Sequence, residues 1–236
     1  MVGYIAGREF LFPFECYSRA MPAKLKSFWW LPIFLVSVAL NVFLLLRGQT
    51  SYSGVEVVGV IDGDTVVLEG KSRVRLRYVD APESGLCGGK EAQELLATLV
   101  VGKMVRIEAQ IPDQYGRGMA LVYVGNTLVN REMVASGWVR YHHDTSPVTD
   151  EMKKADEEAR NQHLGIYGAC QSKENMKNPL CNIKGNIDKS TDTHIYYVPG
   201  CAQYSFAVVE EDIGEQWFCS ESEAREAGYV KAKTCK

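Results

Sequence analysis

The sequence lacks the excess of positive charge that is typical of proteins that coat nucleic acids. Its formal net charge is −3 over 236 residues. Residues 54–170 contain thirteen Lys and Arg against seventeen Asp and Glu. Because a basic surface is the usual footprint of a protein that holds many phosphates at once, this balance argues against a DNA-coating protein. It does not exclude an enzyme that acts on one phosphodiester at a time and needs cationic side chains only there.

The chain also lacks CxxC spacing, internal repeats and low-complexity tracts. Without CxxC pairs, a zinc site is the weaker interpretation of the seven cysteines, although zinc bound with His194 stays an alternative. Cys16 precedes a long apolar stretch, and an even set of six follows it: Cys87, Cys170, Cys181, Cys201, Cys219 and Cys235. An even set favours disulfides in an oxidising compartment. Six cysteines permit about fifteen pairings, so spacing alone does not choose among them.

Residues 27–46, SFWWLPIFLVSVALNVFLLL, contain no charge. About 20 apolar residues suffice to cross a bilayer as a helix, so we predict a transmembrane helix or signal anchor here. Lys24 and Lys26 precede the stretch, and the positive-inside rule then places residues 1–26 in the cytoplasm and the rest outside it, in the periplasm or the extracellular space. A cleaved signal peptide, which would release a secreted protein, is the alternative. Since no small-x-small cleavage site follows Leu46, we favour an uncleaved membrane anchor.

Periodicity and turn residues divide the rest of the chain. Residues 73–79 alternate in the period-2 pattern of a half-buried strand, and residues 89–101 have helical spacing. Asn130 is placed to cap a helix over residues 130–136. Three strands, a helix, two strands and closing helices predict an α+β domain, a five-stranded OB-type β-barrel with three helices. The predicted segments are a linker at 47–54, this domain at 55–168, a linker at 169–182 and a small Cys-containing module at 183–236.

Three short clusters carry the residue types of a phosphoryl-transfer site: IDGDT at 61–65, RLRYVDAPE at 75–83 and DQYGRG at 113–118. Each alone is also compatible with an ordinary turn or strand end, and the first does not continue as an EF-hand loop. Together they offer two aspartates as hard ligands for Ca²⁺ or Mg²⁺, a glutamate to orient or deprotonate a water, and two planar guanidinium groups for phosphate oxygens. Metal-assisted cleavage of a phosphodiester requires these groups. The candidates are Asp64, Asp80, Glu83, Arg75 and Arg117.

In this order, and on this pattern of strands and helices, the three clusters resemble the staphylococcal nuclease (thermonuclease) family over about residues 55–168. The resemblance implies a Ca²⁺ site formed by the carboxylates of Asp64 and Asp80 and by the backbone carbonyl of Ala81. The family often has Thr at the position of Ala81, a difference that matters little if only the carbonyl binds the ion.

The resemblance also implies the roles of the remaining residues. Arg75 and Arg117 would bind and stabilise the phosphate, and Glu83 would act as the general base. The implied activity is Ca²⁺-dependent hydrolysis of DNA and, as an open alternative, RNA, on the 5′ side of the phosphodiester to leave 3′-phosphate ends. The enzyme would be a monomer without a small-molecule cofactor. Residues 84–89 form a short loop where the family's thermonuclease has a long lysine-rich one, and the register of residues 141–143, candidates for stacking on a base, is not set.

Cys87 lies in the loop after Glu83 and Cys170 lies at the end of the domain, and we predict that these two pair. A closed loop of about eighty residues would stabilise the fold by on the order of 4 kcal/mol through the entropy of the unfolded chain. Pairing with a cysteine of the tail is the alternative. The tail resembles a small module found after nuclease-like domains in some exported bacterial proteins, and its four cysteines would staple a unit too small for much core.

The main rival function is a non-catalytic nucleic-acid or protein-binding module on the same OB-type fold, anchored at the membrane. A pure binding module does not need the acids and arginines of a reaction centre, and all five candidate side chains are present. We therefore expect an exported nuclease whose substrate is nucleic acid outside the cytoplasm.

Overall fold

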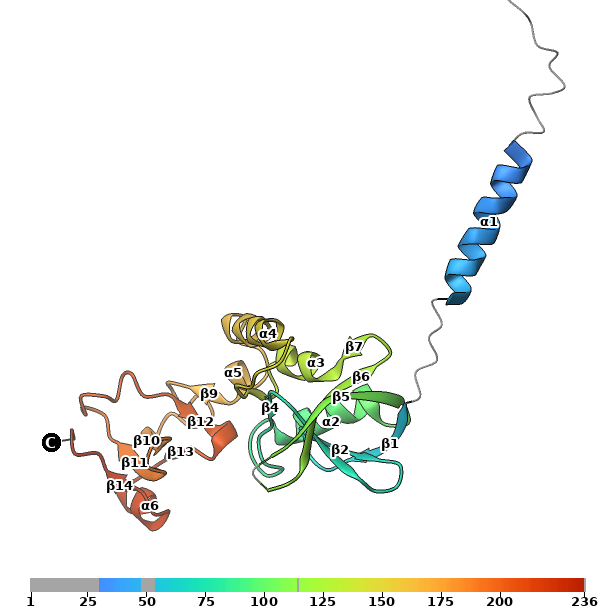
Figure 1. Cartoon of the computed structure of the whole chain (residues 1–236). Coiled ribbons are helices and arrows are strands. Elements are labelled where there is room, and N and C mark those ends of the chain that lie inside the picture. Colours follow the sequence, from blue (N-terminus) through green and yellow to red (C-terminus); the bar gives the residue numbers. More distant parts are fainter. Residues whose placement is uncertain (1–29, 48–53, 114, 236) are drawn as a thin grey trace, which may run out of the picture. The chain divides into compact units, whose positions relative to one another are not determined.

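The computed structural model describes residues 30–47, 54–113 and 115–235 (Figure 1). The chain divides into two units, residues 1–51 and residues 52–236. In the first unit the described part is helix α1, Trp30–Arg47. No helix in the described part of the chain is long and apolar enough to cross a membrane. The predicted span over residues 27–46 overlaps α1 from Trp30 onward, and its first three residues lie outside the described residues. The predictions for residues 1–26, including Cys16, lie outside the described residues.

Six strands of the second unit form one sheet in the order β3-β2-β1-β5-β6-β7. Figure 1 labels β1, β2, β5, β6 and β7. Their bounds are Val55–Val60 for β1, Thr65–Leu68 for β2, Arg73–Leu76 for β3, Met104–Pro112 for β5, Gly118–Val124 for β6 and Thr127–Leu128 for β7. Neighbours in this order pair antiparallel. β3 also pairs with β6 in parallel, so the run from β3 to β6 closes into a ring of paired strands.

Four helices accompany this sheet: α2 (Gly89–Val100), α3 (Val129–Ser136), α4 (Thr149–Asn161) and α5 (Ile166–Ala169). α2 packs on the main core through Ala92, Leu96 and Val100, which are fully buried. These residues recur every four positions and therefore lie on one face of the helix. The helix predicted over residues 89–101 agrees with α2 to within one residue. An α+β fold with a sheet and several helices is confirmed.

The strand predicted over residues 73–79 is two short strands instead. β3 ends at Leu76, and β4, Val79–Asp80, pairs with β8, Arg140–Tyr141. The break follows from Tyr78, whose φ of 68° lies in the left-handed region that an extended strand does not contain. The ring of Tyr78 is buried, and its hydroxyl is hydrogen-bonded to the side chains of Ser146, in the loop before α4, and of Thr149, the first residue of α4; these bonds hold this conformation.

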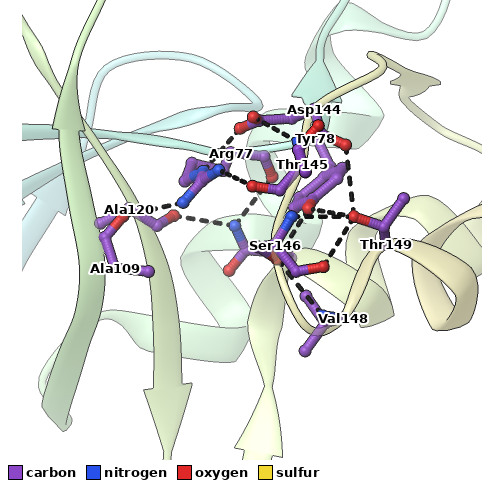
Figure 2. Close-up of polar contacts among 10 residues, drawn as sticks. Arg77, Tyr78, Ala109, Ala120, Asp144, Thr145, Ser146, Val148 and Thr149 are labelled. Atoms are coloured by element: carbon purple, nitrogen blue, oxygen red, sulfur yellow. Dashed lines mark hydrogen bonds and ion pairs between the residues drawn. The ribbon is translucent and has the colours of Figure 1, made fainter.

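Arg77, between the two short strands, carries a charge that is only 4 % exposed. Its Nε donates to Oδ2 of Asp144 at 2.5 Å, its Nη1 to the carbonyl of Ala109 at 3.0 Å and its Nη2 to the carbonyl of Thr145 at 3.0 Å (Figure 2). A buried charge is tolerated when it is paired and hydrogen-bonded. These bonds fasten the turn between β3 and β4 to β5 and to the loop that precedes α4.

Asn130 does not cap a helix as predicted. α3 begins one residue earlier, at Val129, and the side chain of Asn130 is fully buried. Its amide donates to the carbonyls of Arg77 and Ala120, and its oxygen accepts the backbone N–H of Val122 at 2.8 Å. Asn130 therefore joins β6 to the turn that contains Arg77.

After α5 the chain forms a module with its own four-stranded sheet, in the order β13-β10-β11-β14. Its elements are β9 (Gln171–Ser172), β10 (Ile183–Asp188), β11 (Thr193–Tyr197), β12 (Val209–Glu210), η1 (Glu211–Ile213), β13 (Gln216–Phe218), α6 (Glu221–Glu226) and β14 (Val230–Lys231). The buried apolar cluster of this module is small and consists of Ile183, Tyr196, Phe218, Ala224 and Tyr229. A core of this size needs additional stabilisation by cross-links such as disulfides.

The six cysteines after residue 53 form three disulfides. The predicted pair Cys87–Cys170 is confirmed. The other pairs are Cys181–Cys219 and Cys201–Cys235, both within the module. The zinc alternative is therefore wrong, because no thiolate of this set is left to bind a metal and the ring of His194 packs against that of Tyr229, 4.8 Å between centroids.

Replacing both Cys87 and Cys170 by Ser should lower the free energy of unfolding by on the order of 4 kcal/mol. The two residues are 83 positions apart, so the loss of their disulfide frees a long loop in the unfolded chain. Urea unfolding of the parent and of the doubly substituted protein measures the difference. A loss below about 1 kcal/mol would contradict the prediction.

Replacing Asp144 by Asn should destabilise the fold by about 3 kcal/mol at pH 7, because the buried guanidinium of Arg77 loses its counterion. The hydrogen bond from Arg77 lowers the pKa of Asp144. The contribution of a carboxylate with a lowered pKa is present above its unfolded pKa and is lost as pH falls through the folded pKa. Urea unfolding should therefore show a gap between parent and variant that closes below about pH 4.

The matched control for Asp144→Asn is Glu157→Gln, which removes an exposed ion pair with Lys153. Its effect should stay below about 0.5 kcal/mol. The prediction is wrong if the two substitutions lower the free energy of unfolding equally at pH 7, or if the difference between parent and Asp144→Asn does not depend on pH.

Candidate active site

Asp64 is a buried carboxylate in the turn between β1 and β2, with 2 % of its surface exposed. Asp62 shapes this turn by accepting the backbone N–H of Asp64 at 3.0 Å. The hydroxyl of Thr65 donates to Oδ1 of Asp64 at 2.7 Å, and the backbone N–H of Ala81 donates to Oδ2 at 3.3 Å. Asp64 therefore ties the first sequence cluster to the second.

Gly63 allows the same turn to pack against its neighbours. A Cβ at this position would lie 2.5 Å from the Cβ of Ala92 in α2 and 2.8 Å from the Cβ of Ala81. These separations are shorter than packed carbon atoms allow, so a side chain here would displace either α2 or the segment that follows Asp80. The glycine of the IDGDT motif is a packing requirement of the site.

Arg75 bridges the two aspartates. Its Nη2 lies 2.7 Å from Oδ2 of Asp64 and 2.8 Å from Oδ1 of Asp80. Burial raises the pKa of Asp64 to about 7, and the opposite charge of Arg75 only partly offsets this rise. The side chain of Asp80 is 57 % exposed, so it faces solvent while Asp64 is enclosed. The positive charge near the buried carboxylate of Asp64 therefore does not fully compensate its negative charge.

This donor set fits a hard divalent cation. The carboxylates of Asp64 and Asp80 converge on one nitrogen of Arg75, so their oxygens lie near each other, and carboxylate oxygens are the ligands that Ca²⁺ prefers. Ala81, the predicted third ligand through its carbonyl, directly follows Asp80 and contacts Asp64 through its N–H. Among the described residues no cluster of three or more His, Cys, Asp or Glu side chains could hold a metal. The predicted set therefore depends on two carboxylates and a backbone oxygen.

The third cluster is a hairpin organised by Asp113. Oδ1 of Asp113 accepts the backbone N–H groups of Tyr115 at 2.8 Å and of Arg117 at 2.7 Å, and its Oδ2 accepts Nε of Arg117 at 2.5 Å. Gly116 adopts a φ of 78°, which the turn requires. The guanidinium of Arg117 also lies 5.3 Å from the ring centroid of Tyr115. Gln114, between them, lies outside the described residues.

One cleft of about 530 Å³ joins the second and third clusters. From the second cluster its wall contains Arg75 and Asp80, and from the third it contains Tyr115 and Arg117. The remaining polar side chains of the wall are those of Tyr78, Asp113, His142, His143 and Asp144. The cleft therefore presents two guanidinium groups and three carboxylates from segments that are distant in the chain, and it has room for a phosphodiester between them.

Residues 73–169 match the family model described as staphylococcal nuclease homologue. The chain is 36 % identical over 156 residues to a micrococcal nuclease of Shigella flexneri, with 60 % of this chain and 88 % of that protein covered. It is 37 % identical over 117 residues to an uncharacterized endonuclease of Escherichia coli O157:H7, with 47 % and 74 % covered. It is also 34 % identical over 103 residues to a probable staphylococcal-like nuclease of Oryza sativa subsp. japonica, with 44 % and 31 % covered. The chain belongs to the staphylococcal nuclease family.

Glu83 of this nuclease homologue lies outside the wall of the cleft. Its backbone is held by a tight turn, since the N–H of Leu86 donates to its carbonyl at 2.8 Å, and a Cβ on Gly89 would lie 2.3 Å from that same oxygen. The side chain is exposed, and within the described residues its carboxylate has no hydrogen-bond partner. The carboxylate of Glu83 is therefore open to solvent and free to bind a water.

Tyr141, the last residue of β8, and the two histidines that follow it have different surroundings. Tyr141 stacks on Tyr78, with ring centroids 6.0 Å apart and planes at 15°. His142 and His143 line the cleft, and the hydroxyl of Tyr141 lies 3.4 Å from Nδ1 of His143. The three residues thus lie beside the site as expected, but it is the histidines that face it.

Sequence reasoning did not assign a role to Asp113. Its place at the first position of a four-residue turn that ends in Gly116 is the usual signature of an Asp that bonds to the backbone of its own turn. That pattern was sufficient to predict its bonds to the backbone. It was not sufficient to predict that Asp113 also orients the guanidinium of Arg117.

Replacing Arg117 by Ala in this nuclease homologue should lower the rate of phosphodiester cleavage by roughly 10²–10³-fold, because a charge-stabilising donor is lost from the cleft. Arg117→Lys should recover little, since an ammonium group lacks the planar fork of a guanidinium. Steady-state cleavage of a labelled DNA measures both. The matched control is Arg131→Ala, on helix α3 and not among the residues that line the cleft, where the arginine pairs with Glu132 and Glu151. Equal rates for Arg117→Ala and Arg131→Ala would exclude Arg117 from the reaction.

Proposed function

We propose that the protein is a Ca²⁺-dependent endonuclease that hydrolyses phosphodiester bonds of DNA, with RNA as a second substrate. The observation that carries the proposal is the cleft in which Arg75 and Asp80 meet Arg117 across more than thirty residues of sequence. A binding module has no need to gather a cation-binding carboxylate and two phosphate-binding guanidinium groups around one space. The names of the relatives, micrococcal nuclease and endonuclease, support the same reaction class.

In this proposal Asp64 and Asp80, with the carbonyl of Ala81, hold Ca²⁺. The bound ion would supply positive charge to the phosphate and to a water beside it. Arg75 keeps the two carboxylates together, as the distances of 2.7 and 2.8 Å support, and shares the phosphate with Arg117. Both guanidinium groups stabilise the charge that develops on the phosphate oxygens during the reaction.

Glu83 completes the proposed reaction as the general base. A carboxylate oxygen of Glu83 takes a proton from the attacking water, and the water oxygen forms a bond to phosphorus. The bond between phosphorus and the 5′ oxygen breaks, and that oxygen takes up a proton. The products are a 3′-phosphate and a 5′-hydroxyl.

We also propose that the domain at 55–168 is an OB-type barrel that acts as a monomer outside the cytoplasm. The closed run of strands from β3 to β6 supports the barrel. The three disulfides support an oxidising compartment, because such bonds persist in secreted and periplasmic proteins and are rare in the cytosol.

The test is cleavage of single- and double-stranded DNA by the full chain with Ca²⁺ or with a chelator. We expect cleavage with Ca²⁺ alone, 3′-phosphate ends, and a loss of about 10²–10⁴-fold in Glu83→Gln, which removes the base. Glu91→Gln, in the exposed first turn of α2, is the matched control and should keep the parent rate. Cleavage that persists in the chelator would refute the Ca²⁺ dependence. Binding of DNA without cleavage would favour the non-catalytic module instead.

A further inference from the structure

The strand that carries Asp80 depends on one neighbour. Within the described residues β4 and β8 form a two-stranded sheet of their own, and Asp80 lies opposite Arg140 in it. The N–H of His142, just after β8, also donates to the carbonyl of Tyr78 at 2.9 Å. Residues directly opposite in an antiparallel pair project their side chains to the same face. The position of Asp80 therefore follows the position of β8, and Arg140 is its cross-strand neighbour.

Two carboxylates of the C-terminal module hold Arg140. Its Nε donates to Oδ2 of Asp212 at 2.6 Å, and its Nη2 donates to Oε2 of Glu210 at 3.0 Å. The side chain of Asp212 has no exposed surface, and that of Arg140 is 17 % exposed. Removing one partner of a buried pair leaves the other charge without compensation, so this contact is a firm attachment of β8 to the module.

The same stretch of the module is attached to the loop after Glu83. β12 pairs with β9, which directly follows α5. The N–H of Glu211 donates to the carbonyl of Cys170 at 2.8 Å, and Cys170 is bonded to Cys87, four residues after Glu83. Residues 209–213 of the module are thus linked to both segments that carry the acidic residues of the site.

We propose that the C-terminal module supports the active site, and that Arg140, held by Asp212 and Glu210, is a positioning residue for Asp80. This proposal rests on the proposed function, because it concerns the same site. The contact acts in two ways. It fixes β8, and hence the backbone of Asp80, and it keeps the guanidinium of Arg140 away from the Asp80 carboxylate. A released Arg140 would pair with its cross-strand neighbour and compete with the cation for that carboxylate.

The experiment measures Ca²⁺ binding by calorimetry and DNA cleavage by steady-state kinetics, on the full chain. Asp212→Asn keeps the shape of the side chain and removes the charge that holds Arg140. We expect the Kd for Ca²⁺ to rise and kcat to fall, each about 10–100-fold, as for other residues that orient a metal ligand. KM for DNA should change little, because Arg75 and Arg117 are untouched.

Three further variants separate positioning from general stability. Lys177→Gln removes an exposed ion pair with Glu211 in the same stretch and should leave the Kd for Ca²⁺ and kcat within about twofold of the parent. Adding Arg140→Gln to Asp212→Asn should restore part of the lost Ca²⁺ affinity, because the competing guanidinium is gone. Glu210→Gln should shift the Kd in the same direction as Asp212→Asn and by less, and it replaces that variant if the latter does not fold.

The outcomes separate the two proposals. A parent protein that neither binds Ca²⁺ nor cleaves DNA would refute the proposed function and this inference with it. A parent that does both, together with folded Asp212→Asn and Glu210→Gln proteins whose Kd for Ca²⁺ and kcat are unchanged, would overturn the positioning role alone. Loss of Ca²⁺ affinity in Asp212→Asn, with the parent values retained in Lys177→Gln, would establish it.

Discussion

The buried guanidinium of Arg77 is the interaction on which the geometry of the site depends. In an unbroken strand Arg75 and Asp80, five positions apart, would project to opposite faces, because side chains alternate along a strand. The break at Tyr78 lets them meet at 2.8 Å. Arg77 holds the break, since its charge is stable in the interior only while Asp144 and the carbonyl of Ala109 bind it (Figure 2). The strand is therefore interrupted at Tyr78, and this interruption brings Arg75 and Asp80 together.

Much of the framework follows from periodicity, and the exceptions have identifiable causes. The helix over residues 89–101 was predictable because its apolar residues recur on one face, and α2 agrees with it. The break at Tyr78 was not, because a left-handed tyrosine has no sequence signal and is imposed by tertiary hydrogen bonds. Asn130 was assigned to a helix cap because asparagine favours that position. The fold uses the same side chain as a buried link between β6 and the Arg77 turn, which only the packed structure specifies.

In the candidate site, too, some features have a local sequence signal and others are set by long-range contacts. The three clusters name candidate acids and arginines, and the structure brings Arg75, Asp80 and Arg117 into one cleft and pairs Arg75 with Asp64. Cys87 and Cys170 were predictable as a pair because they flank one domain, whereas four tail cysteines offer no such guide. The contact between Arg140 and Asp212 joins residues 72 positions apart, and neither has a local signal. Long-range ion pairs of this kind are set by how the module packs on the domain, which the residue pattern does not encode.

The proposed reaction requires that the cleft between Arg75, Asp80 and Arg117 holds a phosphate beside a cation. A crystal structure of the full chain with Ca²⁺ and a nucleoside 3′,5′-bisphosphate tests it most directly, with anomalous scattering to locate the ion. We expect the ion on the oxygens of Asp64, Asp80 and Ala81, and a phosphate in contact with both guanidinium groups. A phosphate bound elsewhere, or an ion that leaves these carboxylates free, would contradict it.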